Sequence, residues 1–169
     1  LKVLPVLVWD QPERAPMRSW RCWGGIETPE QAAEEVGRIG AELEGIAAAE
    51  QAGFANIRIN TVVQRGVNDH GVEPLIEHFR GTGHTVRLIE FMDVGNSNHW
   101  RLDDVISNAE WVRRIDRRWP IQPVDTHNPA ETARRYHYRD GRGEIGFISS
   151  ISQPFCGGCT RARLTADGI

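Results

Sequence analysis

The sequence is poor in cysteine and in lysine, and both shortages narrow the kinds of protein that it can encode. Only three of its 169 residues are cysteine, with no paired framework, which is typical of a reducing compartment such as the cytoplasm. Lys2 is the single lysine, so arginine supplies nearly all the positive charge, a bias that we attribute to a GC-rich source. The formal net charge of -3 argues against a nucleic-acid-binding protein held by bulk electrostatics.

The sequence also has no long hydrophobic run. The apolar start, from Val3 to Trp9, is short, contains Pro5 and lacks a basic flank, so we expect neither a signal peptide nor a membrane span. The composition, 40% hydrophobic and 25% charged, is nevertheless sufficient for a buried core. The length fits one ordinary domain or two small ones.

Two of the three cysteines, Cys156 and Cys159, are separated by two glycines. Such a segment can direct both thiolates at one metal ion or iron–sulfur cluster. The pair could equally be half of a zinc site, a redox pair or two ordinary thiols, and Cys22 is the one further cysteine. Arg161 and Arg163 follow directly, and guanidinium groups suit phosphate and carboxylate. The spacing predicts a soft-metal site beside an anion site.

Alternating helix and strand patterns cover residues 28–92. They predict a helix that begins at Thr28 and ends at Gly53, a strand over 55–63, a helix capped at Asn68–Asp69 that runs to Phe79, and a strand over 85–92. Short connections between strand, helix and strand imply parallel strands. Residues 1–27 show no clear period.

The pattern changes after Met92. A capping box, residues 107–110, predicts the start of a helix that ends before Pro120. Residues 136–139 and 144–148, joined by a glycine turn, predict a β-hairpin that leads into the two cysteines. None of the six histidines has metal-ligand spacing, so we expect surface or capping roles for them.

Three sequence blocks together resemble one family. They are Ile57–Val63 with Gly66–Asp69, Arg87–Asn96, and Gly146–Ser150 running into Phe155–Leu164. In this order they are similar to the C-terminal half of the GTP 3′,8-cyclase family (molybdenum cofactor biosynthesis protein A), radical S-adenosylmethionine (SAM) enzymes that begin molybdenum cofactor synthesis. The resemblance covers about Leu43 to Gly168, and its last block is the most specific.

The resemblance implies an α/β fold. It would be part of an incomplete (β/α) radical SAM barrel, with a C-terminal helix plus β-hairpin extension carrying the CxxC loop. The chain would then divide into residues 1–27, which are unassigned, 28–94, a partial barrel, and 95–169, a truncated auxiliary-cluster and substrate-binding region. The family further implies a homodimer. From the charge, the cysteine usage and the lack of a hydrophobic span, we expect a cytoplasmic protein with no nucleic-acid or membrane partner.

The same resemblance assigns roles to individual residues. Cys156 and Cys159 would ligate a C-terminal [4Fe–4S] cluster that faces GTP; Arg161, Ala162 and Arg163 would lie along GTP; Arg58 stands where the family has a GTP-binding lysine; and Met92 would contact SAM. Arg58 and Asn60 share one strand face, and Glu90 and Met92 share another, so each pair is expected to point into the barrel.

The sequence departs from the family in two ways. It contains no CxxxCxxC for the SAM-cleaving cluster, and the third cysteine of the second cluster would lie beyond Ile169. SAM and the first cluster therefore belong only to a complete enzyme, and we expect this half to bind GTP. The alternatives are a non-catalytic remnant that holds zinc or no metal, and part of another radical SAM enzyme with an auxiliary cluster, for which a peptide substrate fits the two arginines less well.

Overall fold

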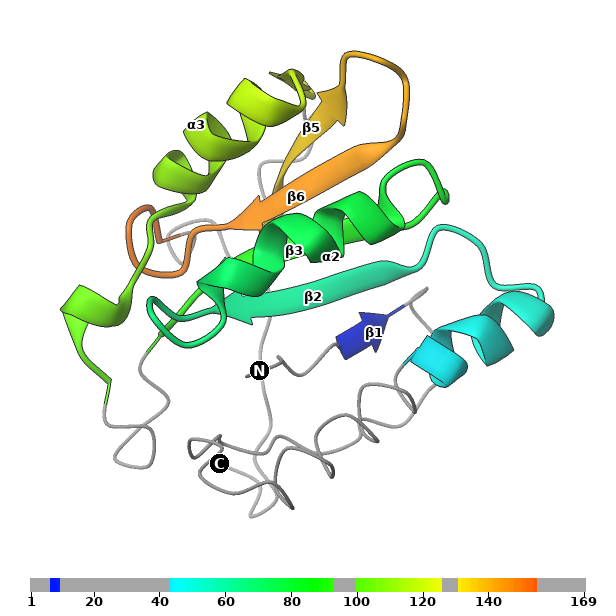
Figure 1. The fold of residues 1–169 in the computed structure, drawn as a ribbon, viewed down its shortest axis with the longest axis horizontal. Helices are drawn as coiled ribbons and strands as arrows, with labels where there is room; N and C mark the ends of the chain where they lie inside the picture. Colours follow the sequence, from blue (N-terminus) through cyan, green and yellow to red (C-terminus); the bar gives the residue numbers. More distant parts are fainter. Residues whose placement is uncertain (1–6, 10–42, 93–99, 126–130, 155–169) are drawn as a thin grey trace.

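The computed structural model describes residues 7–9, 43–92, 100–125 and 131–154, which form a mixed α/β fold (Figure 1). Six strands make one sheet in the order β1-β2-β3-β6-β5-β4. The strands are β1 (Leu7–Trp9), β2 (Arg58–Val63), β3 (Thr85–Glu90), β4 (Ile121–Pro123), β5 (Arg134–Tyr138) and β6 (Glu144–Ile148). The expected α/β class is thus confirmed.

The centre of the sheet is parallel. β2 pairs with β3 through α2 (Val72–Phe79), as the alternation predicted, and β3 pairs in parallel with β6. The pairing of β3 with β6 was not predicted, because nothing local in the sequence indicates a contact between strands so far apart. Parallel strands end at the same edge, so the chain segments that follow β2, β3 and β6 all leave the sheet there.

The predicted β-hairpin is present. β5 and β6 pair antiparallel, and Gly141 and Gly143 between them have φ of 77° and 90°, which glycine adopts without steric cost. β4 then pairs with β5 at the outer edge. β1, in a region for which the sequence predicted no element, pairs antiparallel with β2 at the opposite edge.

The helix ends agree only partly with the predictions. Residues 43–51 are helical, and Gly53, with φ of 88°, lies just past the end of this helix. The Gly53 N–H donates to the Glu50 carbonyl, and the Phe54 N–H donates to the Ala49 carbonyl. The helix predicted from Asn68 begins instead with a 3-10 turn, Asp69–Gly71, before α2. Asn68 makes no side-chain cap, because its amide oxygen accepts from the Gln64 N–H at 2.9 Å.

One of the two hydrogen bonds of the predicted capping box is present. Ser107 is the N-cap of α3 (Asn108–Arg118), and its hydroxyl accepts from the Glu110 N–H at 3.3 Å. The Glu110 carboxylate forms ion pairs with Arg65 and Arg114. A second 3-10 turn, Leu102–Asp104, precedes this helix.

The core lies between the helices and one face of the sheet. Residues from the 43–51 helix, α2, α3 and the strands form a single buried cluster that includes Ile46, Ile59, Ile76, Leu88 and Trp111. Figure 1 shows α2 over β2 and β3, and α3 over β5 and β6. The other sheet face carries the side chains considered below.

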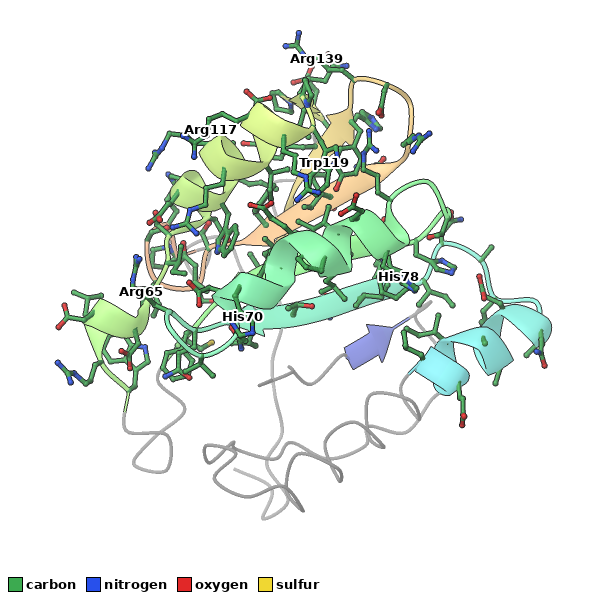
Figure 2. The ribbon with its side chains drawn as sticks, viewed as in Figure 1. Arg65, His70, His78, Arg117, Trp119 and Arg139 are labelled. Carbon is green, nitrogen blue, oxygen red and sulfur yellow. The ribbon has the colours of Figure 1, made fainter. Side chains whose placement is uncertain are left out.

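The histidines differ in exposure. His70, His78 and His137 are exposed, as expected. Figure 2 shows His70 in the turn before α2 and His78 near the far end of that helix. The surface position expected for His84 is wrong. His84 is only 7% exposed, and its Nε2 lies 2.8 Å from Glu50 Oε1. His99 and His127 lie outside the described residues.

Candidate functional site

The residues singled out for the metal and anion site lie mostly outside the described part of the chain. Cys156, Cys159, Arg161, Ala162 and Arg163 follow Pro154, the last described residue. Their roles therefore stay predictions. The structure does show how the chain leaves β6 toward them, and it shows Arg58 and Met92.

Arg58 lies on the sheet face opposite the core. Its side chain shares this face with Asn60, because alternate residues of a strand point the same way. The register places Asn60 opposite Arg87, Arg87 opposite Gly146, and Gly146 opposite Arg135. The side chains of Asn60, Arg87 and Arg135 therefore form a row across the sheet, with Gly146 between the two arginines. The barrel-facing role predicted for Arg58 stays a prediction.

Arg87 is a candidate site residue that the sequence reasoning missed. Burial, followed by repulsion from the positive charge of Arg58, lowers the pKa of Arg87. Arg135, the other cation of the row, is neutralised by Glu131 at 3.0 Å and Glu144 at 3.2 Å. Arg58 and Arg87 make no ion pair with a described residue. The carboxylates of Glu131 and Glu144 oppose the lowering of the Arg87 pKa in part. An anion bound between Arg58 and Arg87 would stabilise both charges further.

A signal for Arg87 was present in the sequence. In the two strands predicted over 55–63 and 85–92, successive side chains point to opposite faces. When such strands are parallel neighbours, an arginine from each can lie on the same face of the sheet. The register needed to align Arg87 with Asn60 comes only from the structure.

Gly146 gives Arg87 its space. A Cβ atom added to Gly146 would lie 2.9 Å from Arg87 Cγ, closer than real Cβ contacts. The Arg87 side chain thus lies against the bare backbone of β6. A side chain at position 146 would displace it.

Glu90 does not point to this face, and the predicted sidedness is wrong for it. Glu90 is opposite Val63 in the register and is 1% exposed on the core side. Its carboxylate accepts hydrogen bonds from residues 108, 151 and 152. The assignment failed because a barrel-facing and a core-facing strand position have the same period of two.

Met92 lies two residues beyond the end of β3 and is 42% exposed. The preceding carbonyl, that of Phe91, accepts from Trp100 Nε1 at 3.0 Å, which fixes the backbone beside Met92. Met92 leaves the same sheet edge as the residues that follow β6. Its predicted contact with SAM remains a proposal.

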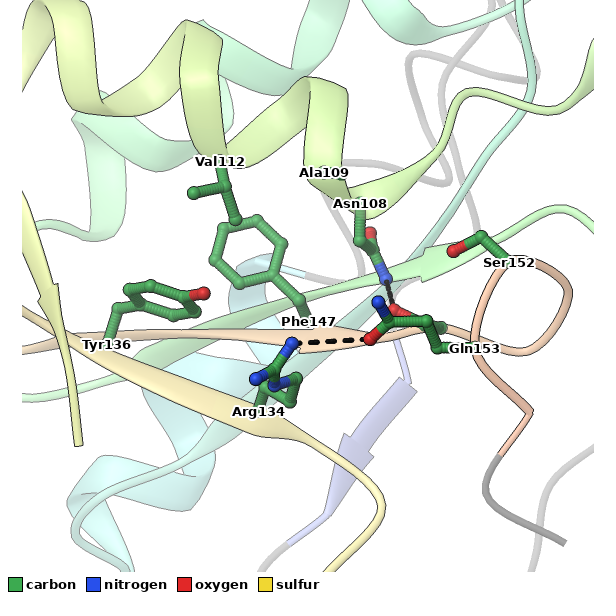
Figure 3. Close-up of a pocket in the computed structure, with 9 residues that line it drawn as sticks. Asn108, Ala109, Val112, Arg134, Tyr136, Phe147, Ser152 and Gln153 are labelled. Carbon is green, nitrogen blue, oxygen red and sulfur yellow. Dashed lines mark hydrogen bonds between the residues drawn. The ribbon is translucent and has the colours of Figure 1, made fainter. Parts of the chain in front are cut away.

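A pocket of about 180 Å³ lies on the other side of the sheet (Figure 3). It is bounded by α3, β5, β6 and the residues after β6, with Val112, Tyr136 and Phe147 among its lining residues. Because Phe147 belongs to the core face, this pocket is separated by the sheet from Arg58 and Arg87. It is therefore not the predicted anion site.

The described residues contain no group of three or more histidine, cysteine or acidic side chains arranged to hold a metal ion. Among the helices in the described ranges, none is long and apolar enough to cross a membrane. The two cysteines that could bind a cluster lie outside these ranges.

Comparison with known proteins gives the family. The family pattern described as Molybdenum Cofactor Synthesis C matches residues 84–169. Proteins named GTP 3′,8-cyclase are similar over most of the chain: that of Xanthomonas axonopodis pv. citri is 57% identical over 132 residues, covering 78% of this chain and 40% of the relative. That of Acidothermus cellulolyticus is 56% identical over 126 residues, covering 75% and 35%.

A third relative, from Synechococcus sp. WH7803, is 48% identical over 149 residues, covering 86% of this chain and 41% of the relative. The chain thus spans about two fifths of the length of these relatives. The match falls on their C-terminal part, in agreement with the resemblance carried by the three sequence blocks. The chain belongs to the Molybdenum Cofactor Synthesis C family.

Proposed function

We propose that this chain is the GTP-binding part of a radical SAM GTP 3′,8-cyclase of molybdenum cofactor biosynthesis. The observation that carries the proposal is the pair Arg58 and Arg87, which lie on one sheet face without a described ion-pair partner. A triphosphate would supply a direct ion-pair partner for both guanidiniums. The relatives' name supplies the identity of the nucleotide.

The cysteines complete the proposed site. Two thiolates from Cys156 and Cys159 are a donor set that suits a [4Fe–4S] cluster, with a further ligand from outside these 169 residues. The cluster would supply a Lewis-acidic iron to the guanine base. Arg161, Ala162 and Arg163 follow along the chain, so the two guanidiniums there would bind the nucleotide near the same cysteines.

The residues of this chain then divide the work of holding GTP. Arg58 and Arg87 bind phosphate oxygens from the sheet face, and Arg161 and Arg163 bind from the segment after β6. Met92, at the edge where β3 ends, would contact SAM in the complete enzyme. The chemistry of SAM needs a cysteine motif that these 169 residues do not contain, so we assign to this part the seating of GTP.

The test is GTP affinity, measured by calorimetry on the protein that carries this segment. We expect Arg87→Ala and the double change of Arg161 and Arg163 to alanine each to weaken GTP binding by about tenfold or more. Arg117→Ala, an exposed arginine on α3, is the control and should leave affinity unchanged. The effect should shrink from GTP to GMP, because the arginines bind phosphates.

Equal GTP affinity in all variants would overturn the proposal. One alternative is a non-catalytic remnant that holds zinc or no metal. Iron content separates the two: the cyclase part should hold iron that is lost when Cys156 and Cys159 are both changed to serine, whereas the remnant should hold zinc or no metal. Another radical SAM enzyme would hold iron but not GTP.

A further inference from the structure

The carboxylate of Glu90 is a buried junction between three parts of the fold. Glu90 is the last residue of β3 and is 1% exposed. Its side chain points to the core side, where α3 begins and where the chain leaves β6. An isolated carboxylate in such a place would be costly, so its partners must account for its presence.

Four hydrogen bonds satisfy this carboxylate. Oε1 accepts from the Asn108 N–H at 2.8 Å and from the Ser152 hydroxyl at 2.5 Å. Oε2 accepts from the N–H groups of Ile151 and Ser152 at 2.9 and 2.7 Å. Three of the four bonds go to Ile151 and Ser152, so the main task of Glu90 is to hold the exit from β6.

The first turn of α3 contributes to the same junction. The Asn108 N–H is one of the unpaired donors at the start of a helix, and the partial positive charge there favours a carboxylate. The Asn108 side chain also donates to Ser149 Oγ at 3.1 Å (Figure 3). Both the backbone and the side chain of Asn108 thereby tie α3 to the residues after β6.

We propose that Glu90 is the positioning residue that sets where the cysteine and arginine segment begins. Ser152 lies four residues before Cys156, and four extended residues reach at most about 14 Å. By holding Ser152 beside the end of β3, Glu90 therefore fixes the point from which the chain enters the cysteine and arginine segment. The part of this inference that concerns GTP rests on the proposed function.

The test compares Glu90→Gln with Glu50→Gln by hydrogen exchange. The glutamine at position 90 keeps the shape but presents an NH₂ group, a donor, where an acceptor is needed. We expect amide exchange in a peptide spanning residues 149–160 to become about tenfold faster, with β2 and α2 unchanged. Glu50→Gln, which alters one contact to His84 far from this exit, should leave residues 149–160 unchanged.

A milder variant covers the case in which Glu90→Gln does not fold. Ser152→Ala removes one hydrogen bond to Glu90 and keeps the two backbone bonds, so it should accelerate exchange of the same peptide by roughly threefold. Unchanged exchange in the folded Glu90→Gln protein, or in Ser152→Ala where the first is unfolded, would overturn the inference.

GTP affinity tests the part of the inference that concerns GTP binding. We expect Glu90→Gln to weaken GTP binding by about tenfold while its melting temperature and iron content show a folded, loaded protein. Faster exchange with unchanged GTP affinity would overturn the positioning role. If the unaltered protein binds no GTP, the proposed function fails instead, and the alkylation rates of Cys156 and Cys159 take the place of affinity: Glu90→Gln must raise them.

Discussion

At the scale of single residues, Gly146 has the clearest consequence. Its missing side chain leaves the space in which Arg87 lies, and Arg87 is half of the proposed phosphate-binding pair. We predict that Gly146→Ala displaces Arg87, weakens GTP binding by about tenfold and lowers the free energy of unfolding by about 1–3 kcal/mol. Calorimetric titration and urea unfolding measure the two effects.

Gly71→Ala is the matched control, because an added Cβ at Gly71 meets no atom within 4 Å and its φ of -86° suits alanine. The effect of Gly146→Ala on affinity should largely disappear when Arg87 is already alanine. If Gly146→Ala weakens GTP binding equally in both backgrounds, Gly146 does not act through Arg87.

The same scale shows where sequence reasoning succeeds. Ser107 and Gly53 were placed correctly because a cap is a local device whose partners lie within a few residues. Asn68 does stand at the N-cap of the 3-10 turn before α2, but its amide oxygen accepts from the Gln64 N–H and not from the helix. The positions of Glu90 and Arg87 could not be predicted, because they depend on which face of the sheet the helices cover. The sequence of a single strand does not reveal that face.

At the scale of elements, Arg80 joins the end of α2 to the hairpin. It pairs with Asp140 in the β5–β6 connection, and its guanidinium lies 5.1 Å from the ring centre of Tyr138 and 5.8 Å from that of Trp119. We predict that Arg80→Ala lowers the free energy of unfolding by about 1–2 kcal/mol, mostly through the two aromatic contacts. Urea unfolding provides the measurement.

Arg117→Ala is the control for this loss, since the Arg117 side chain points away from the molecule (Figure 2) and is exposed. It should change stability by no more than about 0.5 kcal/mol. Equal effects of the two variants would show that Arg80 does not hold the hairpin.

Tyr138, the last residue of β5, makes the hairpin sensitive to alkaline pH. Burial raises the pKa of the Tyr138 phenol far above the ordinary 10.0, and the charge of Arg80 opposes this rise in part. The unfolded chain ionises first, so this contribution is fully present below about pH 10 and is lost as pH rises further. The loss should reach up to about 1.4 kcal/mol per pH unit.

Urea midpoints measured from pH 8 to about pH 11 test this expectation. Tyr138→Phe should lack this part of the alkaline decline while keeping the decline due to other groups. Parallel pH profiles for the two proteins would contradict it.

At the scale of the whole molecule, the sequence predicted the classes of element but not their assembly. The parallel β2–α2–β3 unit followed from short connections, and the hairpin followed from its glycine turn. The contact between β3 and β6 could not be foreseen, because it depends on packing rather than on any local pattern. β1 is also informative: a (β/α) barrel would continue past β2 with a parallel strand, whereas β1 is antiparallel.

The pairing of β3 with β6 has a consequence for synthesis on the ribosome. β6 ends about 60 residues after β3, so β3 leaves the ribosome well before its partner exists. At roughly 5–20 residues per second, the β3 edge waits for about 3–12 s with unpaired N–H and C=O groups. During this interval the nascent chain has an open strand edge next to Leu88 and Ile89, and that edge is where a chaperone would be needed.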